Sequence, residues 1–161
     1  MAHDNPQSEI HLATRQDVPA VAAVLLAAFA EYEPLYTAGG FAATTPTSEQ
    51  IERRFDEGPI WIALLDGVIV GTVAAVLRDD LTFYVRSMAV LPTARGHNIG
   101  GSLLGKIDLF ATEHGAKRLL LSTTPFLARA IRLYEREGFQ HSEEGPSDLF
   151  GTPLFTMAKP I

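Results

Sequence analysis

The sequence has no cysteine, which excludes a disulfide framework, a thiolate zinc site and a cysteine nucleophile. Basic residues are in the minority: 13 Lys and Arg stand against 19 Asp and Glu, for a formal charge of -6. That sign is wrong for a protein that binds nucleic acid phosphates or anionic membranes, and it favours cationic partners. The longest apolar run, Ala20 to Ala30, is too short for the ~20 residues that span a bilayer.

The ends and the interior of the chain also lack special segments. Residues 1–8 are polar, with no basic region followed by an apolar stretch, so we expect no secretory signal and a cytoplasmic protein. No pair of histidines or carboxylates has the spacing of H-E-x-x-H, so we expect no metal. The 161 residues contain no repeat and are long enough for one core. We therefore predict a flexible tail over residues 1–8 and a single domain over residues 9–161.

Hydrophobic periodicity and turn residues predict an alternation of helices and strands. Helices are expected over four segments: Asp17 to about Tyr32, Ser48 to about Gly58, Ile99 to His114, and Ala128 to Glu137. Strands are expected over seven: Glu9–Ala13, Ile60–Leu65, Val68–Leu77, Leu81–Leu91, Leu119–Ser122, Phe139–His141 and Leu154–Lys159.

Two further predictions concern connections and edges. Asp66-Gly67 predicts a hairpin turn, whereas Pro34 to Pro46 is expected to be a loop. The result is an α+β fold with a mixed, mainly antiparallel central sheet of about six to seven strands, flanked by about four helices. An exposed edge at the C-terminal strand, Leu154–Lys159, would permit a homodimer through sheet pairing.

The segment from Arg86 to Leu104 carries the clearest chemical signal. A strand ends at a proline, a glycine-rich turn follows, and a helix starts within that turn. Several backbone N–H groups and the positive end of a helix dipole converge there, which suits a pyrophosphate. Gly96, Gly100 and Gly101 would let a bulky anion approach, and Arg95 would add charge. An ordinary strand-to-helix turn is the structural alternative.

Two motifs resemble the GNAT family of N-acetyltransferases. The first is Met88-Ala89-Val90-Leu91-Pro92 followed by Arg95-Gly96-His97-Asn98-Ile99-Gly100. The second is Leu133-Tyr134-Glu135-Arg136-Glu137-Gly138-Phe139. The order of elements also matches the family from Glu9 to Lys159.

The resemblance implies transfer of an acetyl group from acetyl-CoA, as co-substrate, to a primary amine of a small molecule or peptide. The amine would attack directly in a ternary complex, without a metal. Tyr134 would be the catalytic residue that gives a proton to the departing CoA thiolate, although spacing alone equally allows a tyrosine packed in the core. The CoA-binding residues would be Met88, Ala89 and Val90 along the pantetheine, and Arg95, Gly96, His97, Asn98, Ile99, Gly100 and Gly101 around the pyrophosphate.

Three departures from the family pattern affect the site. Asn98 replaces the usual first motif glycine, but asparagine tolerates a left-handed backbone better than other non-glycine residues. Leu127 stands where family members often have a CoA-contacting asparagine, and the strand near Leu121 lacks the glutamate that some members use as a base. These departures leave open a non-catalytic acyl-CoA-binding regulatory module, or an acyltransferase that uses another acyl-CoA.

The acceptor amine has weaker candidates. Tyr32, Glu33 and Tyr36 lie in the connection after the first helix, which in the family covers the acceptor site. An acidic and aromatic segment there could bind a cationic amine, or it could be an ordinary solvated helix end.

Overall fold

The computed structural model describes residues 8–78 and 81–161. The first seven residues of the predicted tail, and Asp79 and Asp80 of the predicted turn at residues 78–80, therefore lie outside the described residues. Ser8 was predicted to belong to the tail but begins the first strand instead, where it pairs with Leu65.

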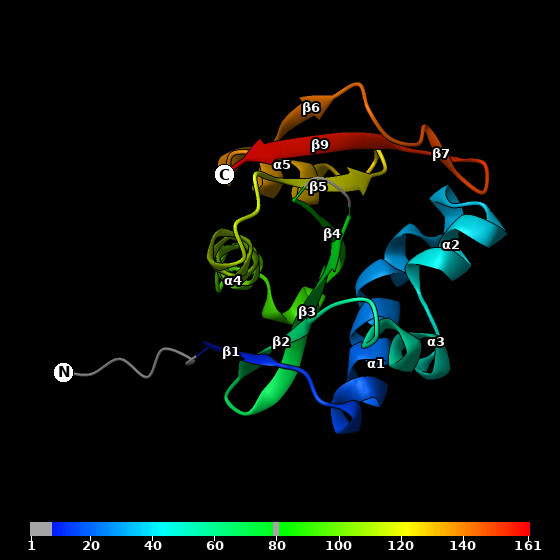
Figure 1. Ribbon diagram of the computed structural model, residues 1–161. Coiled ribbons are helices and arrows are strands. Elements are labelled where there is room, and N and C mark those ends of the chain that lie inside the picture. The colour runs from blue at the N-terminus through cyan, green and yellow to red at the C-terminus, as the bar shows by residue number, and fades with distance from the viewer. Residues whose placement is uncertain (1–7, 79–80) are drawn as a thin grey trace.

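A seven-stranded sheet forms the centre of the described part of the chain (Figure 1). In spatial order its strands are β1 (Ser8–Leu12), β2 (Ile60–Leu65), β3 (Val68–Leu77), β4 (Thr82–Val90), β5 (Arg118–Thr123), β9 (Phe155–Pro160) and β6 (Gln140–Ser142). Every neighbouring pair is antiparallel except β4 and β5, which are parallel. The predicted mixed, mainly antiparallel sheet is confirmed.

Helices cover both faces of this sheet (Figure 1). They are α1 (Val18–Phe29), α2 (Ala38–Thr44), α3 (Ser48–Arg54), α4 (Ile99–Glu113) and α5 (Ala128–Arg136), with short 3-10 segments at Arg15–Asp17, Ala30–Leu35 and Pro92–Ala94. Side chains alternate along β2, so that Ile60 and Ile62 pack with α1 and α3, whereas Trp61 and Ala63 pack with α4. The sheet therefore separates two apolar cores.

The segment predicted as a loop at Pro34 to Pro46 contains a helix instead, which corrects that prediction. Thr37 caps α2 by accepting a hydrogen bond from the Gly40 N–H at 3.0 Å. A β-carbon at Gly40 would lie 2.3 Å from the Thr152 hydroxyl, so glycine is needed for this helix to pack against a small hairpin, β7 (Asp148–Leu149) with β8 (Thr152–Pro153). A β-carbon at Gly39 would likewise lie 2.9 Å from Cβ of Phe150, so Gly39 and Gly40 permit close packing, and long-range contacts override their low helix propensity. The predicted second helix ends early, at Arg54.

The C-terminal strand was predicted to be an exposed edge, and this is wrong. β9 pairs with β5 on one side and β6 on the other, so its backbone groups are used within the sheet, whose edge strands are β1 and β6. The structure therefore removes the ground on which a homodimer through this strand was expected.

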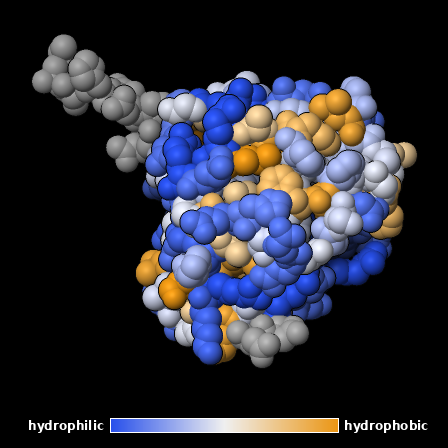
Figure 2. Space-filling view, turned by 90° about the horizontal axis from the view of Figure 1, so that it is seen from above, coloured by the Kyte–Doolittle hydropathy of each residue, from blue (hydrophilic) through white to orange (hydrophobic). Residues whose placement is uncertain are grey.

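On the face shown in Figure 2, apolar residues form small patches among hydrophilic ones.

The helical stretch from Arg15 to Leu35 is 21 residues long and apolar enough to span a membrane by length and composition. Core helices of soluble proteins meet the same criteria. Here Val21, Leu25 and Ala28 on one face of α1 are buried in the core with residues of β2, β3 and β4. The apolar face of α1 is thus explained by packing within the domain.

Candidate active site

The sheet splits where its two parallel strands diverge. β4 pairs with β5 only through residues 82–84 and 118–120, after which β4 runs on to Val90 without a partner on the β5 side. On its other side β4 stays paired with β3 up to Val90, with a register shift between Thr72 and Ala74, opposite Ser87, which has a left-handed backbone at φ 54°. Such a bulge bends a strand and redirects its side chains. Two adjoining cavities open in the resulting gap between β4, β5 and α5.

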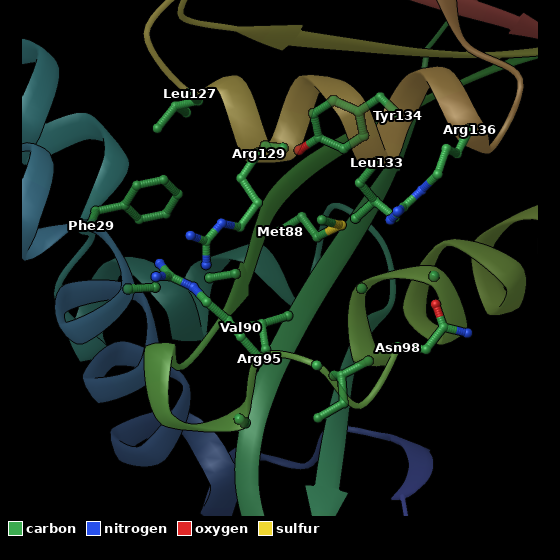
Figure 3. Close-up of a pocket in the computed structure, with 18 of the residues that line it drawn as sticks. Phe29, Met88, Val90, Arg95, Asn98, Leu127, Arg129, Leu133, Tyr134 and Arg136 are labelled. Carbon is green, nitrogen blue, oxygen red and sulfur yellow. The ribbon is translucent and has the colours of Figure 1, made fainter.

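The first cavity has a volume of about 460 Å³ and lies between β4, the start of α4, α5 and the end of α1 (Figure 3). It is lined by nine of the ten residues predicted to bind CoA: Met88, Ala89, Val90, Arg95, Gly96, Asn98, Ile99, Gly100 and Gly101. His97, the tenth, is exposed and does not line the cavity. The sequence motif therefore corresponds to one continuous cavity wall.

Asn98 gives the turn before α4 its shape. Its backbone is left-handed, with φ 54° and ψ 32°, as its tolerance for that conformation suggested. Its carbonyl accepts the Ser102 N–H at 3.1 Å, which is the first backbone hydrogen bond of the helix. The N–H groups of Ile99, Gly100 and Gly101 precede that bond and have no acceptor within the helix. They are available to an anion in the cavity that these residues line.

Substitutions at Asn98 test this backbone conformation. We expect Asn98→Gly to keep both stability and acetyl-CoA affinity, because glycine adopts positive φ without strain. Asn98→Val should lower the free energy of unfolding by about 1–2 kcal/mol, since a β-branched residue is strained there. Urea denaturation and calorimetric titration measure the two quantities. Equal stability of the valine variant would contradict the left-handed assignment.

Two positions at the head of α4 leave little room for a side chain. A β-carbon at Gly100 would stand 2.6 Å from Cδ2 of Leu133, and one at Gly101 would stand 2.5 Å from Oδ1 of Asn98. Both distances are below any normal contact of a β-carbon. The two glycines therefore keep this part of the cavity wall free of side chains.

Cations surround the first cavity. The lining residues include Arg95, Arg129 and Arg136 but no Asp or Glu, and Figure 3 shows the guanidinium groups of Arg95 and Arg129 directed into the same space. Arg95 donates to Glu31 Oε1 at 2.7 Å, which fixes its position. Paired guanidinium groups suit phosphate oxygens. Sequence reasoning found Arg95 but missed Arg129 and Arg136, which come from one face of α5.

The second cavity, of about 220 Å³, adjoins the first beyond Tyr134. Four residues line both cavities: Phe29, Met88, Leu127 and Tyr134. Its own walls come mainly from β4 and the end of β5, with Arg54 of α3 and Tyr36. Sequence reasoning did not single out Arg54, or Arg86 and Ser87 on β4. An arginine within the apolar pattern of that strand was the available signal.

Tyr134 stands at the junction of the two cavities and is buried, with 8% of its surface exposed. Its ring packs edge-on against Phe139, at 6.0 Å between centroids. No residue in the described part of the chain hydrogen-bonds its hydroxyl, unlike the satisfied hydroxyl expected of a structural core tyrosine. Burial, with smaller contributions from Tyr36 and Tyr84, raises the pKa of Tyr134 above its ordinary value. Tyr134 therefore stays protonated and can act as a proton donor.

The three residues predicted to bind the acceptor lie in three different environments. Tyr32 lines the first cavity and Tyr36 the second, and both rings contact Phe126, at 6.2 and 4.9 Å between centroids. Glu33 is exposed and lines neither cavity. The structure thus brings the aromatic part of this segment to the site and leaves its acidic residue in solvent.

Comparisons with known proteins match this chain to acetyltransferases. The model of the acetyltransferase (GNAT) family matches residues 25–139. An uncharacterised N-acetyltransferase of Escherichia coli (strain K12), YjgM, is 32% identical over 84% of this chain and 84% of its own length. The N-acetylaspartate synthetase of Homo sapiens is 37% identical over 67% of this chain, but the match covers 36% of that relative.

The fold has a close counterpart among solved structures. The PaiA N-acetyltransferase from Thermoplasma acidophilum, solved in complex with coenzyme A, superposes with a TM-score of 0.80 over 96% of this chain and 99% of its own. The two sequences are 15% identical, so this likeness concerns the fold.

Proposed function

The chain belongs to the acetyltransferase (GNAT) family, and from this premise we propose that it is an acetyl-CoA-dependent N-acetyltransferase acting on a primary amine. The observation that carries the proposal is the meeting of two cavities at Tyr134. One is cationic and bounded by the start of a helix, whereas the other is small and separately walled. A transferase that brings two substrates together needs such an arrangement.

The first cavity fits acetyl-CoA as co-substrate. A β-carbon at Gly100 would fill part of the space along the wall that the glycines form. The backbone N–H groups at the start of α4, which have no acceptor within the helix, line the same cavity as Arg95. We assign the pyrophosphate to the segment from Arg95 to Gly101, and the pantetheine to the β4 backbone at Met88, Ala89 and Val90. Acetyl-CoA supplies the acetyl group as a thioester.

The second cavity would hold the amine. The amine nitrogen attacks the thioester carbonyl carbon, a C–N bond forms, the C–S bond breaks, and the nitrogen loses a proton. Tyr134 donates its proton to the departing sulfur and recovers one from solvent. A β4 backbone N–H near Met88 would stabilise the developing oxyanion. No Asp or Glu lines this cavity, so the amine reaches it already neutral or loses its proton through water.

Calorimetric titration with acetyl-CoA, followed by assay of free thiol with a panel of amines, tests this function. We expect saturable binding and thiol release that depends on an amine. The panel includes aspartate, because the name of the human relative states N-acetylaspartate as its product. Binding without amine-dependent release would favour a regulatory module, and stronger turnover with another acyl-CoA would change the donor. Absence of binding would refute the proposal.

A further inference from the structure

The charge of the second cavity identifies the chemistry of the acceptor. Its lining residues include two arginines, Arg54 from α3 and Arg86 from β4, and no Asp, Glu or Lys. The sequence had suggested the opposite, a cationic amine held by an acidic segment at Glu33. Because Glu33 lies outside the cavity, the groups that face the acceptor are cationic.

Arg86 has an unused donor inside the protein. One end of its guanidinium pairs with Glu57, while its Nε is buried and has no hydrogen-bond partner among the described residues. Buried N–H groups are nearly always paired in native proteins, so the unpaired Nε leaves positive charge uncompensated beside the cavity that Arg86 lines. Carboxylate oxygens suit the fork of a guanidinium group.

Arg54 also lines the second cavity, and its hydrogen-bond partner there is uncharged. Its Nη1 donates to the Ser87 hydroxyl at 2.6 Å. Burial, together with the neighbouring positive charge of Arg86, lowers the pKa of Arg54, and Glu57 offsets only part of this. Two guanidinium groups thus share one nearby carboxylate, which leaves one positive charge uncompensated.

The bulge in β4 adds residues to the cavity wall next to Arg86. Tyr84 and Arg86 share one face of the strand by ordinary alternation, and at the bulge the consecutive residues Ser87 and Met88 both line the cavity. The left-handed Ser87 at the bulge permits this. Strained backbone of this kind clusters at functional sites.

A second unpaired polar group belongs to a residue that lines the same cavity. Thr124, after the end of β5, has 2% of its surface exposed, and its hydroxyl makes no hydrogen bond of normal geometry among the described residues. The Tyr36 phenol is its neighbour, and burial raises the pKa of that phenol, so Tyr36 stays neutral.

Resting on the proposed function, we propose that the acceptor is a small amine that carries a carboxylate, such as an amino acid, and that Arg54 and Arg86 bind this carboxylate. The volume of about 220 Å³ suits a small molecule. The same positive charges disfavour the ammonium form of the acceptor and thereby favour the neutral, nucleophilic amine. They also repel polyamines.

Matched acceptors test the inference. Initial rates of thiol release are compared for alanine with alaninamide, for aspartate with its diamide, and for spermidine. We expect kcat/KM at least ~10-fold higher for each carboxylated member, because a charge-assisted hydrogen bond is lost in the amide. Arg54→Gln and Arg86→Gln should each raise the KM for the carboxylated acceptors by about 10- to 100-fold and leave the acetyl-CoA Kd unchanged.

Arg53→Gln is the matched control, since Arg53 is the next residue of α3 and its side chain is 70% exposed. It should leave all rates unchanged, and thermal melting should show each variant folded. Equal rates with amides or spermidine, unchanged KM in both arginine variants, or turnover confined to amines without a carboxylate would overturn the inference alone. Failure of the wild-type protein to bind acetyl-CoA would instead remove the proposed function.

Discussion

Replacing Tyr134 by phenylalanine should lower kcat by about 10- to 1000-fold and leave the acetyl-CoA Kd nearly unchanged. The substitution removes one hydroxyl and keeps the ring that packs on Phe139. Because no described residue hydrogen-bonds that hydroxyl, the variant leaves no unpaired partner behind. A loss confined to kcat would thus report proton donation to the departing sulfur.

The pH profile gives a second readout for Tyr134. A proton donor works only below its own pKa, and burial raises the pKa of Tyr134 above its ordinary value. The wild-type rate should therefore show no fall from this group up to about pH 10, the ordinary tyrosine pKa. An unchanged kcat in Tyr134→Phe, with a melting temperature like that of the wild type, would return Tyr134 to a packing role.

Introducing glutamate at Gly100 should abolish acetyl-CoA binding. Its β-carbon would meet Leu133 at 2.6 Å, and its carboxylate would lie in the cavity assigned to the pyrophosphate. Two like charges about 4 Å apart repel by about 4 kcal/mol at an effective dielectric constant of ~20, which corresponds to a loss of about 1000-fold in affinity. Calorimetric titration measures the effect.

Gly105→Glu provides the matched control on the same helix. Gly105 is exposed, and a β-carbon there would have no atom within 4 Å. This variant makes the same change in charge and composition, so it should bind acetyl-CoA like the wild type, with α4 stabilised by the loss of a helical glycine. If both variants bound equally well, the phosphate assignment at the head of α4 would be wrong.

Local signals were sufficient for most of the fold. The hairpin at Asp66-Gly67 was predicted with its strand boundaries, because turn chemistry and alternation depend on neighbouring residues. The helix at Ala38–Thr44 was missed, because its glycines are favoured by close contacts with Phe150 and Thr152, more than a hundred residues away. The position of β9 between two strands also depends on long-range pairing that the sequence does not display.

The same contrast between local signals and long-range contacts applies to the residues of the site. The residues from Met88 to Gly101 were found because their motif is continuous in sequence and forms one wall of the first cavity. Arg54 and Arg86 were not found, since they come from different elements, α3 and β4, and meet only in the folded chain. The formal charge of -6 for the chain even suggested cationic partners, although the second cavity is itself cationic.

The most direct test of the central claim is mass spectrometry of the amine after incubation with acetyl-CoA and the wild-type protein, alongside assay of free CoA thiol. We expect N-acetylated product and free thiol in a one-to-one ratio for a carboxylated amine such as aspartate or alanine. Thiol released without any acetylated amine, or no thiol beyond the protein-free control with any amine of the panel, would contradict the assignment of this chain as an N-acetyltransferase.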